Sequence, residues 1–313
     1  VTLSQGSAIV GPHGHLGVSI DVGGSAADYD SNSGPVTRKL NTALEVWTDM
    51  FGQEDVIKGG AAVMYDVDQI IKAGQAGRNG VGVIADVWSL DATSRNPAWV
   101  QLPSMLSPRK NYQLLLLPDG KILAVGGCIV AGVCNDPANQ VLFPESFDPA
   151  NPGLGWKVLA EADQGRHAHS TAVLLPDARI LFAGGAVLPN NSVVLYPTGQ
   201  VFSPPYLFNP DGTPASRPVI DAVPTEIAYG KSFEITTTQA GAITRVSLIR
   251  PGATTHSWDQ DQRAMPLLFA VGSVNTLLIA APVNAQTAPP GYYMLFIVDD
   301  QGVPSEAKFV KVG

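Results

Sequence analysis

The sequence predicts an all-β protein in which propeller blades are followed by a β-sandwich. Three segments share one internal pattern, namely an apolar strand, a tight turn of the Pro-Asp-Gly type, a second strand and a paired glycine. Short strands joined by a tight turn form a hairpin. The segments lie at residues 62–74, 115–127 and 173–185, and a fainter copy ends at Gly24.

The second position of each glycine pair recurs at a regular interval. It falls at Gly24, Gln75, Gly127 and Gly185, so the steps are 51, 52 and 58 residues. This period is close to the roughly 50 residues of a kelch blade, which is a four-stranded sheet. We therefore expect residues 1–216 to form part of a kelch-type β-propeller, with about four blades in this chain.

Four repeats are fewer than we expect for a propeller of this type. The sequence also begins with what resembles the end of a repeat rather than its start. We therefore expect further blades to complete the propeller. They would come from a second polypeptide or from a cleaved N-terminal fragment.

The chain changes character beyond residue 216. Strand-like segments follow, separated by turn residues, and examples are residues 232–237, 244–249, 275–280 and 292–298. Short alternating segments of this kind are typical of half-buried strands. We therefore predict that residues 217–313 form a β-sandwich of immunoglobulin-like size, without the disulfide and tryptophan signature of that fold.

The composition argues against two classes of partner. Charged residues make up 15% of the 313 residues, and the net charge is −8. A basic surface that could bind nucleic acid is therefore not expected. No stretch approaches the roughly 18 consecutive apolar residues of a membrane span, so we predict no span in this sequence.

The two cysteines, Cys128 and Cys134, flank a short loop that contains a glycine. They form either a disulfide or two buried free thiols, and we favour the disulfide. Residues 190–192 read Asn-Asn-Ser, which matches a glycosylation sequon. Both features point to an oxidising compartment, so we expect a secreted protein, extracellular or periplasmic.

Two histidines from different parts of the chain suggest a metal site at the domain junction. His169 ends the run 165–170 in the propeller, and His256 lies in the second domain. Neutral imidazole is a good ligand for copper and zinc. His167 stands two residues before His169, on the same side of a strand, so it is either a third ligand or an ordinary polar strand residue. Residues 13 and 15, also histidines, repeat this spacing and are either ligands or part of a solvated loop.

Four other side chains each allow two interpretations. Tyr65 and Tyr112 occupy inner-strand positions of their repeats. They either line the rim of the axial cavity or pack between blades with satisfied hydroxyl groups. Arg109 and Arg166 either bind an anionic substrate or pair with carboxylates.

Several motifs together resemble those of galactose oxidase and glyoxal oxidase, the copper radical oxidases. Residues 166–170 resemble the Arg-x-Tyr-His-Ser run of that family and are followed by Leu-Leu-Pro-Asp. In the C-terminal part the matching motifs are Ser216-Arg217-Pro218, Ser247-Leu248-Ile249-Arg250, Thr255-His256 with Asp261-Gln262-Arg263, residues 290–296, and Gly302-Val303-Pro304-Ser305. The resemblance covers most of the chain from about residue 55.

The resemblance implies a seven-bladed propeller that carries copper near its axis. The following sandwich sends a hairpin up the central channel, and His256 at its tip would be one copper ligand. His169 would be another. Two tyrosines complete the site in that family. One is axial, and the other is cross-linked to a cysteine and stores the radical. Such a site oxidises an alcohol or aldehyde and reduces O₂ to H₂O₂.

This sequence departs from the family pattern at two points. Ala168 occupies the position of the axial tyrosine. The cross-linked tyrosine and cysteine belong to early blades that this chain does not contain, and Cys128 and Cys134 lie in a later blade. The radical cofactor therefore cannot be formed from this chain alone.

Three functions remain open from the sequence. The first is the C-terminal part of a copper oxidase that acts on an alcohol, an aldehyde or a carbohydrate, with its missing blades supplied by another chain. The second is a non-catalytic member of the family that binds glycans or proteins, which Ala168 favours. The third is a zinc site, which ranks last because no Glu or Asp is arranged nearby as a general base.

Overall fold

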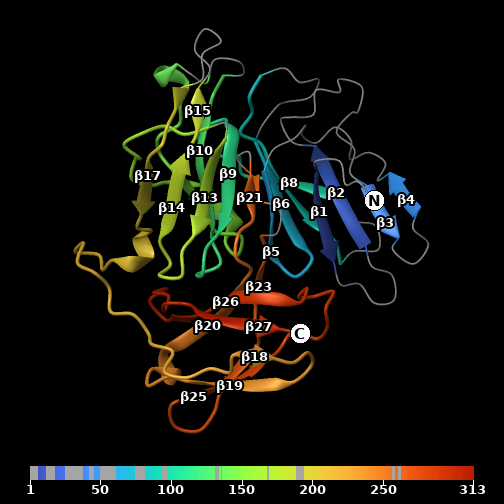
Figure 1. Cartoon of the computed structure of the whole chain (residues 1–313), viewed down its shortest axis with the longest axis vertical. Coiled ribbons are helices and arrows are strands. Elements are labelled where there is room, and N and C mark those ends of the chain that lie inside the picture. The colour runs from blue at the N-terminus through green and yellow to red at the C-terminus, as the bar shows by residue number, and fades with distance from the viewer. Residues whose placement is uncertain are drawn as a thin grey trace.

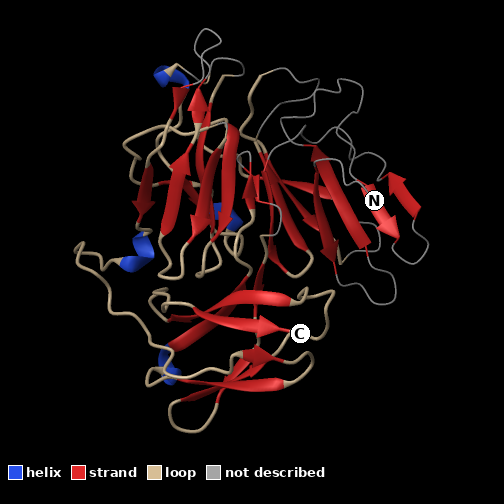
Figure 2. Ribbon diagram, viewed as in Figure 1, coloured by secondary structure: helices blue, strands red, loops and turns tan. Residues whose placement is uncertain are grey.

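A computed structural model describes residues 6–11, 18–24, 38–41, 46–49, 61–74, 82–93, 98–130, 134, 136–167, 169–187, 194–255, 258–259 and 262–313. These residues form an all-β protein with a fan of sheets above a sandwich (Figures 1 and 2). Within the described part, the helical segments are single 3₁₀ turns: η2 (Pro137–Asn139), η3 (Pro152–Leu154), η5 (Pro205–Leu207) and η6 (Ala240–Ala242). No helix found there is long and apolar enough to cross a bilayer.

Four successive sheets form the blades, which confirms the predicted fold class. In the first three, consecutive strands pair antiparallel in chain order. The strands of the first blade are β1 (Gly6–Gly11), β2 (Val18–Gly24), β3 (Arg38–Asn41) and β4 (Val46–Asp49). Those of the second are β5 (Ala61–Asp66), β6 (Gln69–Ala73), β7 (Val87–Asp91) and β8 (Trp99–Leu102).

The third and fourth blades follow the same plan. The third contains β9 (Lys110–Leu116), β10 (Ile122–Cys128), β11 (Glu145–Phe147) and β12 (Lys157–Val158). The fourth has the order β13-β14-β17, with β13 (Ser170–Leu174), β14 (Ile180–Gly184) and β17 (Gly199–Phe202). A separate hairpin, β15 (Ala186–Val187) with β16 (Val194–Leu195), lies between β14 and β17 in the sequence.

The turn between the first two strands of a blade needs one residue with positive φ. In the third blade this residue is Gly120, with φ +89°, and its N–H donates to the carbonyl oxygen of Leu117 at 3.0 Å. Ala178 takes the same position in the fourth blade, with φ +66°. Glycine adopts this conformation without a steric cost, whereas alanine does not.

The paired glycines are required by close backbone contacts. A Cβ atom on Gly126 would lie 2.5 Å from the carbonyl oxygen of Arg166, and one on Gly127 would lie 2.7 Å from the Cβ of Tyr112. Both glycines also have positive φ. The repeated glycine pair thus marks a point where the end of β10 touches a neighbouring strand and blade.

Neighbouring blades pack face to face, and β9 shows how the sequence achieves this. Successive side chains of a strand point to opposite faces of its sheet. Leu114 and Leu116 pack in the core shared with the second blade, whereas Leu115 and Leu117 pack in the core shared with the fourth. Both faces of this strand are buried, which explains the unbroken run of leucines at 114–117.

The second part of the chain is a sandwich of a five-stranded and a three-stranded sheet. The larger sheet has the order β18-β27-β26-β20-β23, with β18 (Glu226–Ile227), β20 (Ile243–Ile249), β23 (Ala264–Pro266), β26 (Gly291–Asp299) and β27 (Lys308–Val312). The smaller has the order β19-β25-β24, with β19 (Ser232–Thr236), β24 (Phe269–Val271) and β25 (Thr276–Ala280). Fully buried side chains such as Ile235, Leu277 and Leu295 fill the space between the sheets.

The blades contact the sandwich through the hairpin turns between their first two strands (Figure 1). The hydroxyl of Ser247 donates to the carbonyl oxygen of Pro118 at 2.8 Å. The guanidinium of Arg217 donates to the carbonyl oxygen of Asp177 at 2.9 Å. We call this the sandwich end of the propeller. The opposite end, where β9 and β13 begin, is called the far end.

Candidate metal site

A hairpin of the sandwich leaves its own domain and lies along the inner strands of the propeller (Figure 1). It connects β20 to β23 and contains β21 (Thr254–Thr255) and β22 (Trp258–Asp259). Strand β21 lies against β13, and β22 lies against β9. We call residues 250–263 the inserted hairpin. It brings a segment of the second domain towards the far end of the first.

Two contacts attach the inserted hairpin to adjacent blades. The side-chain amide of Gln262 donates to the carbonyl oxygen of Leu114 at 2.9 Å and accepts from the N–H of Leu116 at 2.5 Å, so it pairs with β9 as a strand residue would. The hydroxyl of Thr254 forms a hydrogen bond with the hydroxyl of Thr171, the second residue of β13. The first contact holds the base of the hairpin, which is the part next to β23. The second holds its upper part, which contains β21 and β22.

His169 lies at the far end, directly before β13. Its side chain is exposed, and its φ is +61°, in the left-handed region that non-glycine residues seldom adopt. The N–H of Ser170 donates to the carbonyl oxygen of His167 at 3.0 Å, which closes a turn around this residue. Strained backbone of this kind clusters at functional sites, and the geometry presents the His169 imidazole to solvent at the propeller's far end.

His167 is buried, with 2% of its surface exposed. Burial lowers the pKa of its imidazole, and the nearby His169 lowers it further. The ring is therefore neutral at pH 7, which is the form that ligates metals. The two imidazoles are near each other at the start of β13. They do not share a strand face as expected, because both residues precede β13, and His167 is buried whereas His169 is exposed.

Four residues considered for the site, His13, His15, Ala168 and His256, lie outside the described residues, as does the sequon at 190–192. The neighbouring backbone is described on both sides: Thr255 pairs with Trp258 across the inserted hairpin. The copper ligands inferred from the resemblance therefore stay a prediction. Among the residues that the structure does describe, no three His, Cys, Asp or Glu side chains gather in one place.

The two tyrosine candidates lie apart from each other. Tyr65 is in the last part of β5, at the sandwich end, where burial and then Asp66 raise its pKa. Tyr112 is buried between blades, and its hydroxyl donates to the carbonyl oxygen of Ala73 at 2.6 Å. Burial raises the pKa of Tyr112 strongly. This geometry matches the packing interpretation for Tyr112, because its hydroxyl is already bonded within the propeller.

The two arginines that were candidates for substrate binding are buried and structural. Arg109 pairs with Glu145, with 2.8 Å between Nη2 and Oε1, and both side chains are fully buried. Arg166 donates to the carbonyl oxygen of Gly184 at 2.6 Å and to the hydroxyl of Thr198 at 2.8 Å. Arg109 is thus paired with a carboxylate, as one of the two interpretations expected, whereas the acceptors of Arg166 are a carbonyl oxygen and a hydroxyl group.

The disulfide between Cys128 and Cys134 is confirmed, with 5.3 Å between the Cα atoms. Cys128 ends β10, so the loop that the disulfide closes lies at the far end. The amide of Gln140 donates to the carbonyl oxygen of Cys134 at 3.2 Å, and the same side chain packs against Gly165. The disulfide loop is therefore connected to the segment that leads into His167 and His169.

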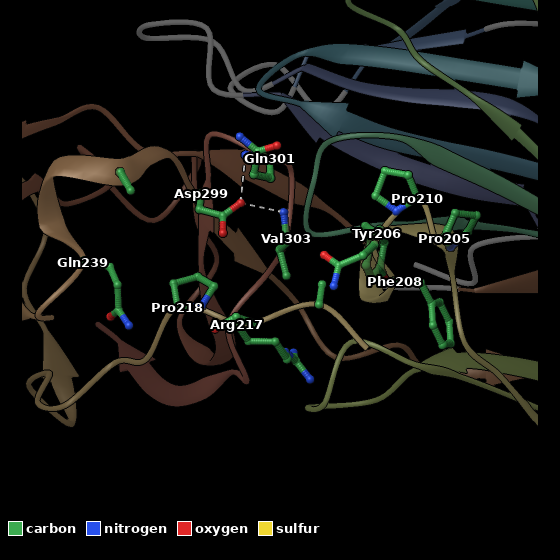
Figure 3. A pocket seen from close by; sticks show the side chains of 14 residues that line it. Pro205, Tyr206, Phe208, Pro210, Arg217, Pro218, Gln239, Asp299, Gln301 and Val303 are labelled. Carbon is green, nitrogen blue, oxygen red and sulfur yellow. Dashed lines mark hydrogen bonds between the residues drawn. The ribbon is translucent and has the colours of Figure 1, made fainter. Parts of the chain in front are cut away.

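A surface pocket of about 790 Å³ lies at the sandwich end, between the linker 205–218 and the sandwich (Figure 3). Its polar groups serve the local fold. Asp299 accepts from the N–H groups of Gln301 and Val303 at 3.0 and 2.9 Å, and Arg217 donates to backbone carbonyl oxygens. The pocket is separated from His169 by the length of the blade, so it does not belong to the candidate metal site.

The sequence did not single out the two threonines of the hairpin contact. Gln262 belongs to the Asp261-Gln262-Arg263 motif, so the motif marked its importance without showing its partner strand. Thr171 and Thr254 are 83 residues apart. In the sequence, these threonines are marked only by their place, since each lies two residues from a predicted histidine ligand.

Two protein-family models match this chain. They are the glyoxal oxidase N-terminus, over residues 44–206, and the galactose oxidase-like early set domain, over residues 217–312. Among curated relatives, galactose oxidase of Gibberella zeae is 34% identical over 212 residues, which cover 65% of this chain and 29% of the relative. Aldehyde oxidase GLOX of Vitis pseudoreticulata is 32% identical over 237 residues, which cover 71% and 44%.

A solved structure extends the similarity to the fold. It is described as a novel fungal alcohol oxidase with catalytic diversity among the AA5 family, in complex with copper. The TM-score is 0.81 at 30% identity, and the match covers 97% of this chain and 66% of that one. The matched part of this chain covers less than half the length of galactose oxidase and of aldehyde oxidase GLOX, the two curated relatives named above. The two family models together cover most of its residues, and it belongs to the family of glyoxal oxidase and galactose oxidase-like proteins.

Proposed function

We propose that this chain is part of a secreted copper oxidase that oxidises an alcohol or aldehyde and reduces O₂ to H₂O₂. One observation carries the proposal: the inserted hairpin reaches the propeller end at which His169 lies. Thr254 on the hairpin bonds to Thr171, two residues after His169. The relatives named galactose oxidase and aldehyde oxidase, and the copper-bound alcohol oxidase, support the reaction class.

His169 and His256 would hold the copper, with His167 as a third candidate. Imidazole nitrogen is a ligand that suits copper, and the described part of the chain provides two imidazoles next to each other at the far end. This donor set fits copper as part of a complete site. Copper bound there would supply one-electron redox chemistry and a Lewis-acidic position for the substrate oxygen.

The remaining groups of the site would come from further blades. Ala168 has no side-chain acid or base, so another group must take the proton that leaves the substrate. Neither cysteine is free, because Cys128 and Cys134 are bonded to each other. We therefore propose that blades outside this chain supply the tyrosines and the cysteine that the oxidase chemistry needs.

Exposed apolar faces support the presence of further blades. Val201 of the fourth blade is 47% exposed and, with its cross-strand neighbour Leu181, lies on the face turned away from the third blade. On the sandwich, Tyr292 and Phe309 are 63% and 50% exposed. They continue the sheet face on which Met294 packs against the propeller core. Further blades would cover both surfaces.

Two other features follow from the same proposal. The disulfide supports an oxidising compartment and hence an extracellular or periplasmic location. We also propose a division into a propeller part, residues 1–216, and a galactose oxidase-like sandwich, residues 217–313.

Copper analysis of the intact native protein tests the proposed site. We expect about one copper per chain in the wild-type protein, with a strong reduction in His169→Ala and in His256→Ala. Lys231→Ala, at an exposed position of the sandwich, serves as the control and should keep its copper. The proposal is wrong if the wild-type protein contains no copper, or if both ligand variants keep it; a stable metal-free protein would favour the glycan- or protein-binding function.

Mass and gel analysis of the native material tests the further blades. We expect additional sequence that carries a cysteine and a tyrosine, either in the same polypeptide or in a second one. A native species with only the 32.8 kDa of this chain that nevertheless oxidises alcohols or aldehydes would contradict this part of the proposal.

A further inference from the structure

We propose that Thr171 and Thr254 form a positioning pair that sets the separation between His169 and His256. This inference rests on the copper site proposed above. The two hydroxyls are bonded to each other across the domain boundary. Thr171 follows His169 by two residues, and Thr254 precedes His256 by two residues. A step of two residues spans at most about 7 Å of chain, so each predicted ligand is within that reach of its threonine.

The inserted hairpin needs such a contact because it is short. In the described part of the hairpin, its ladder consists of two residue pairs, Thr254 with Asp259 and Thr255 with Trp258. An isolated two-stranded hairpin is at best marginally stable in water. The carboxylate of Asp259 accepts from the N–H of Ala253 at 2.9 Å, which closes the hairpin on itself but does not attach it to the propeller.

Two further contacts hold the base of the hairpin. Gln262 bonds to Leu114 and Leu116 in the second half of β9. Arg263 forms a backbone bridge with Met64 of β5. These contacts determine where the hairpin enters the propeller. The threonine pair lies further along the hairpin, at the beginning of β13, and together with the packing of β22 against β9 it determines where the upper part of the hairpin sits.

Threonine suits this role for two physical reasons. Its branched Cβ restricts χ1, so the hydroxyl has few alternative positions. A hydroxyl both donates and accepts, which lets two threonines bond without a third group. Both residues are half-buried, which limits competition from water. A serine keeps the hydroxyl, and a valine keeps the shape without it.

Functional sites require supporting residues that hold the ligands within about 0.5 Å of the right geometry. Loss of a supporting partner outside the ligand set typically lowers metal affinity by about 10- to 100-fold. We expect a loss of this size when the threonine pair can no longer bond. The Cu(II) electron paramagnetic resonance spectrum should change with it, because ligand geometry determines the hyperfine splitting.

The test uses the intact protein with Thr171→Val, Thr254→Val and the corresponding serine variants. Copper affinity is measured by competition with a chelator, and the Cu(II) spectrum is recorded for each protein. Hydrogen exchange of residues 253–259 in the metal-free protein gives a readout without copper. Thr244→Val is the control, because its hydroxyl donates to the carbonyl oxygen of Asp299 within the sandwich.

We expect both valine variants to bind copper about 10- to 100-fold more weakly, with altered spectra and faster exchange in the hairpin. The serine variants and Thr244→Val should resemble the wild-type protein. Valine variants with the affinity and spectrum of the wild-type protein would overturn this inference alone. A wild-type protein that binds no copper would overturn the proposed function as well. If one valine variant does not fold, the other decides the outcome, since each removes the same hydrogen bond.

Discussion

The buried ion pair of the third blade offers a sharp test of how the far end is held together. Glu145 accepts hydrogen bonds from Arg109 at 2.8 and 3.2 Å, and from the N–H groups of Leu106 and Ser107 at 2.6 and 3.2 Å. Arg109 also donates to the carbonyl oxygens of Gly126 and Phe143 at 2.8 and 2.7 Å. The pair thus connects β10, β11 and the segment before β9.

Glu145→Gln should destabilise the propeller by about 3–5 kcal/mol. The substitution leaves the Arg109 charge buried without its counter-charge, and removing one partner of a buried pair costs this amount. One carboxylate oxygen also becomes an NH₂ group among N–H donors. For a propeller of this size, the change corresponds to a decrease in Tm of about 6–20 °C.

Calorimetric melting of the wild-type protein, Glu145→Gln and Glu161→Gln measures the effect. Glu161 is exposed, so its variant should stay within about 0.5 kcal/mol of the wild-type protein. Arg109→Lys keeps the charge but cannot reach all three acceptors with one ammonium group, and we expect about 1–3 kcal/mol. A cost below about 1 kcal/mol for Glu145→Gln would refute the argument that the buried pair holds the blade, because buried charges cannot lose a partner so cheaply.

Two further predictions follow from the disulfide and from the buried tyrosines. Replacing Cys128 and Cys134 together by serine should lower the free energy of unfolding by about 2 kcal/mol, since the bond closes a short loop; urea unfolding measures this, and an unchanged midpoint would count against it. Burial raises the pKa values of Tyr112 and Tyr206 above 10, so the unfolded chain loses these protons first and stability should fall as the pH rises above about 10. Alkaline denaturation of Tyr112→Phe and Tyr206→Phe should start at a higher pH than that of the wild-type protein. Tyr292→Phe, at an exposed position, is the control and should denature at the same pH as the wild-type protein. Equal denaturation midpoints in all variants would contradict the argument that the two buried tyrosines lower stability at high pH.

The blades could be predicted because their signal is local and repeated. The pair Gly126-Gly127 is required by contacts with a carbonyl oxygen and a Cβ atom. The first glycine of the pair has a positive φ in the second, third and fourth blades, at Gly74, Gly126 and Gly184, so this backbone requirement leaves a period in the sequence. Positions that tolerate other residues leave a weaker signal. Asp68 and Ala178 have positive φ, as Gly120 has, although neither is a glycine, so the turn had to be recognised from its surroundings.

The candidate site was less predictable because it depends on contacts across long stretches of sequence. Gln262 bonds to Leu114 across 148 residues, and no composition or periodicity shows such a pairing. Tyr112 illustrates a second limit. An inner-strand tyrosine can face the axis or a neighbouring blade, and only the position of Ala73 shows that its hydroxyl is used for packing.

The division of the proposed ligands between two domains has a thermodynamic consequence. His169 belongs to the propeller and His256 to the sandwich, so copper would bind fully only when the two are docked. A ligand that binds one state stabilises it by RT ln(1 + [L]/Kd), which is about 2.7 kcal/mol at a hundredfold excess over Kd. Docking and copper affinity are therefore linked, and the linkage is reciprocal. Residues that hold the blades on the sandwich, such as Arg217 and Ser247, would influence copper affinity although they lie at the opposite end of the propeller.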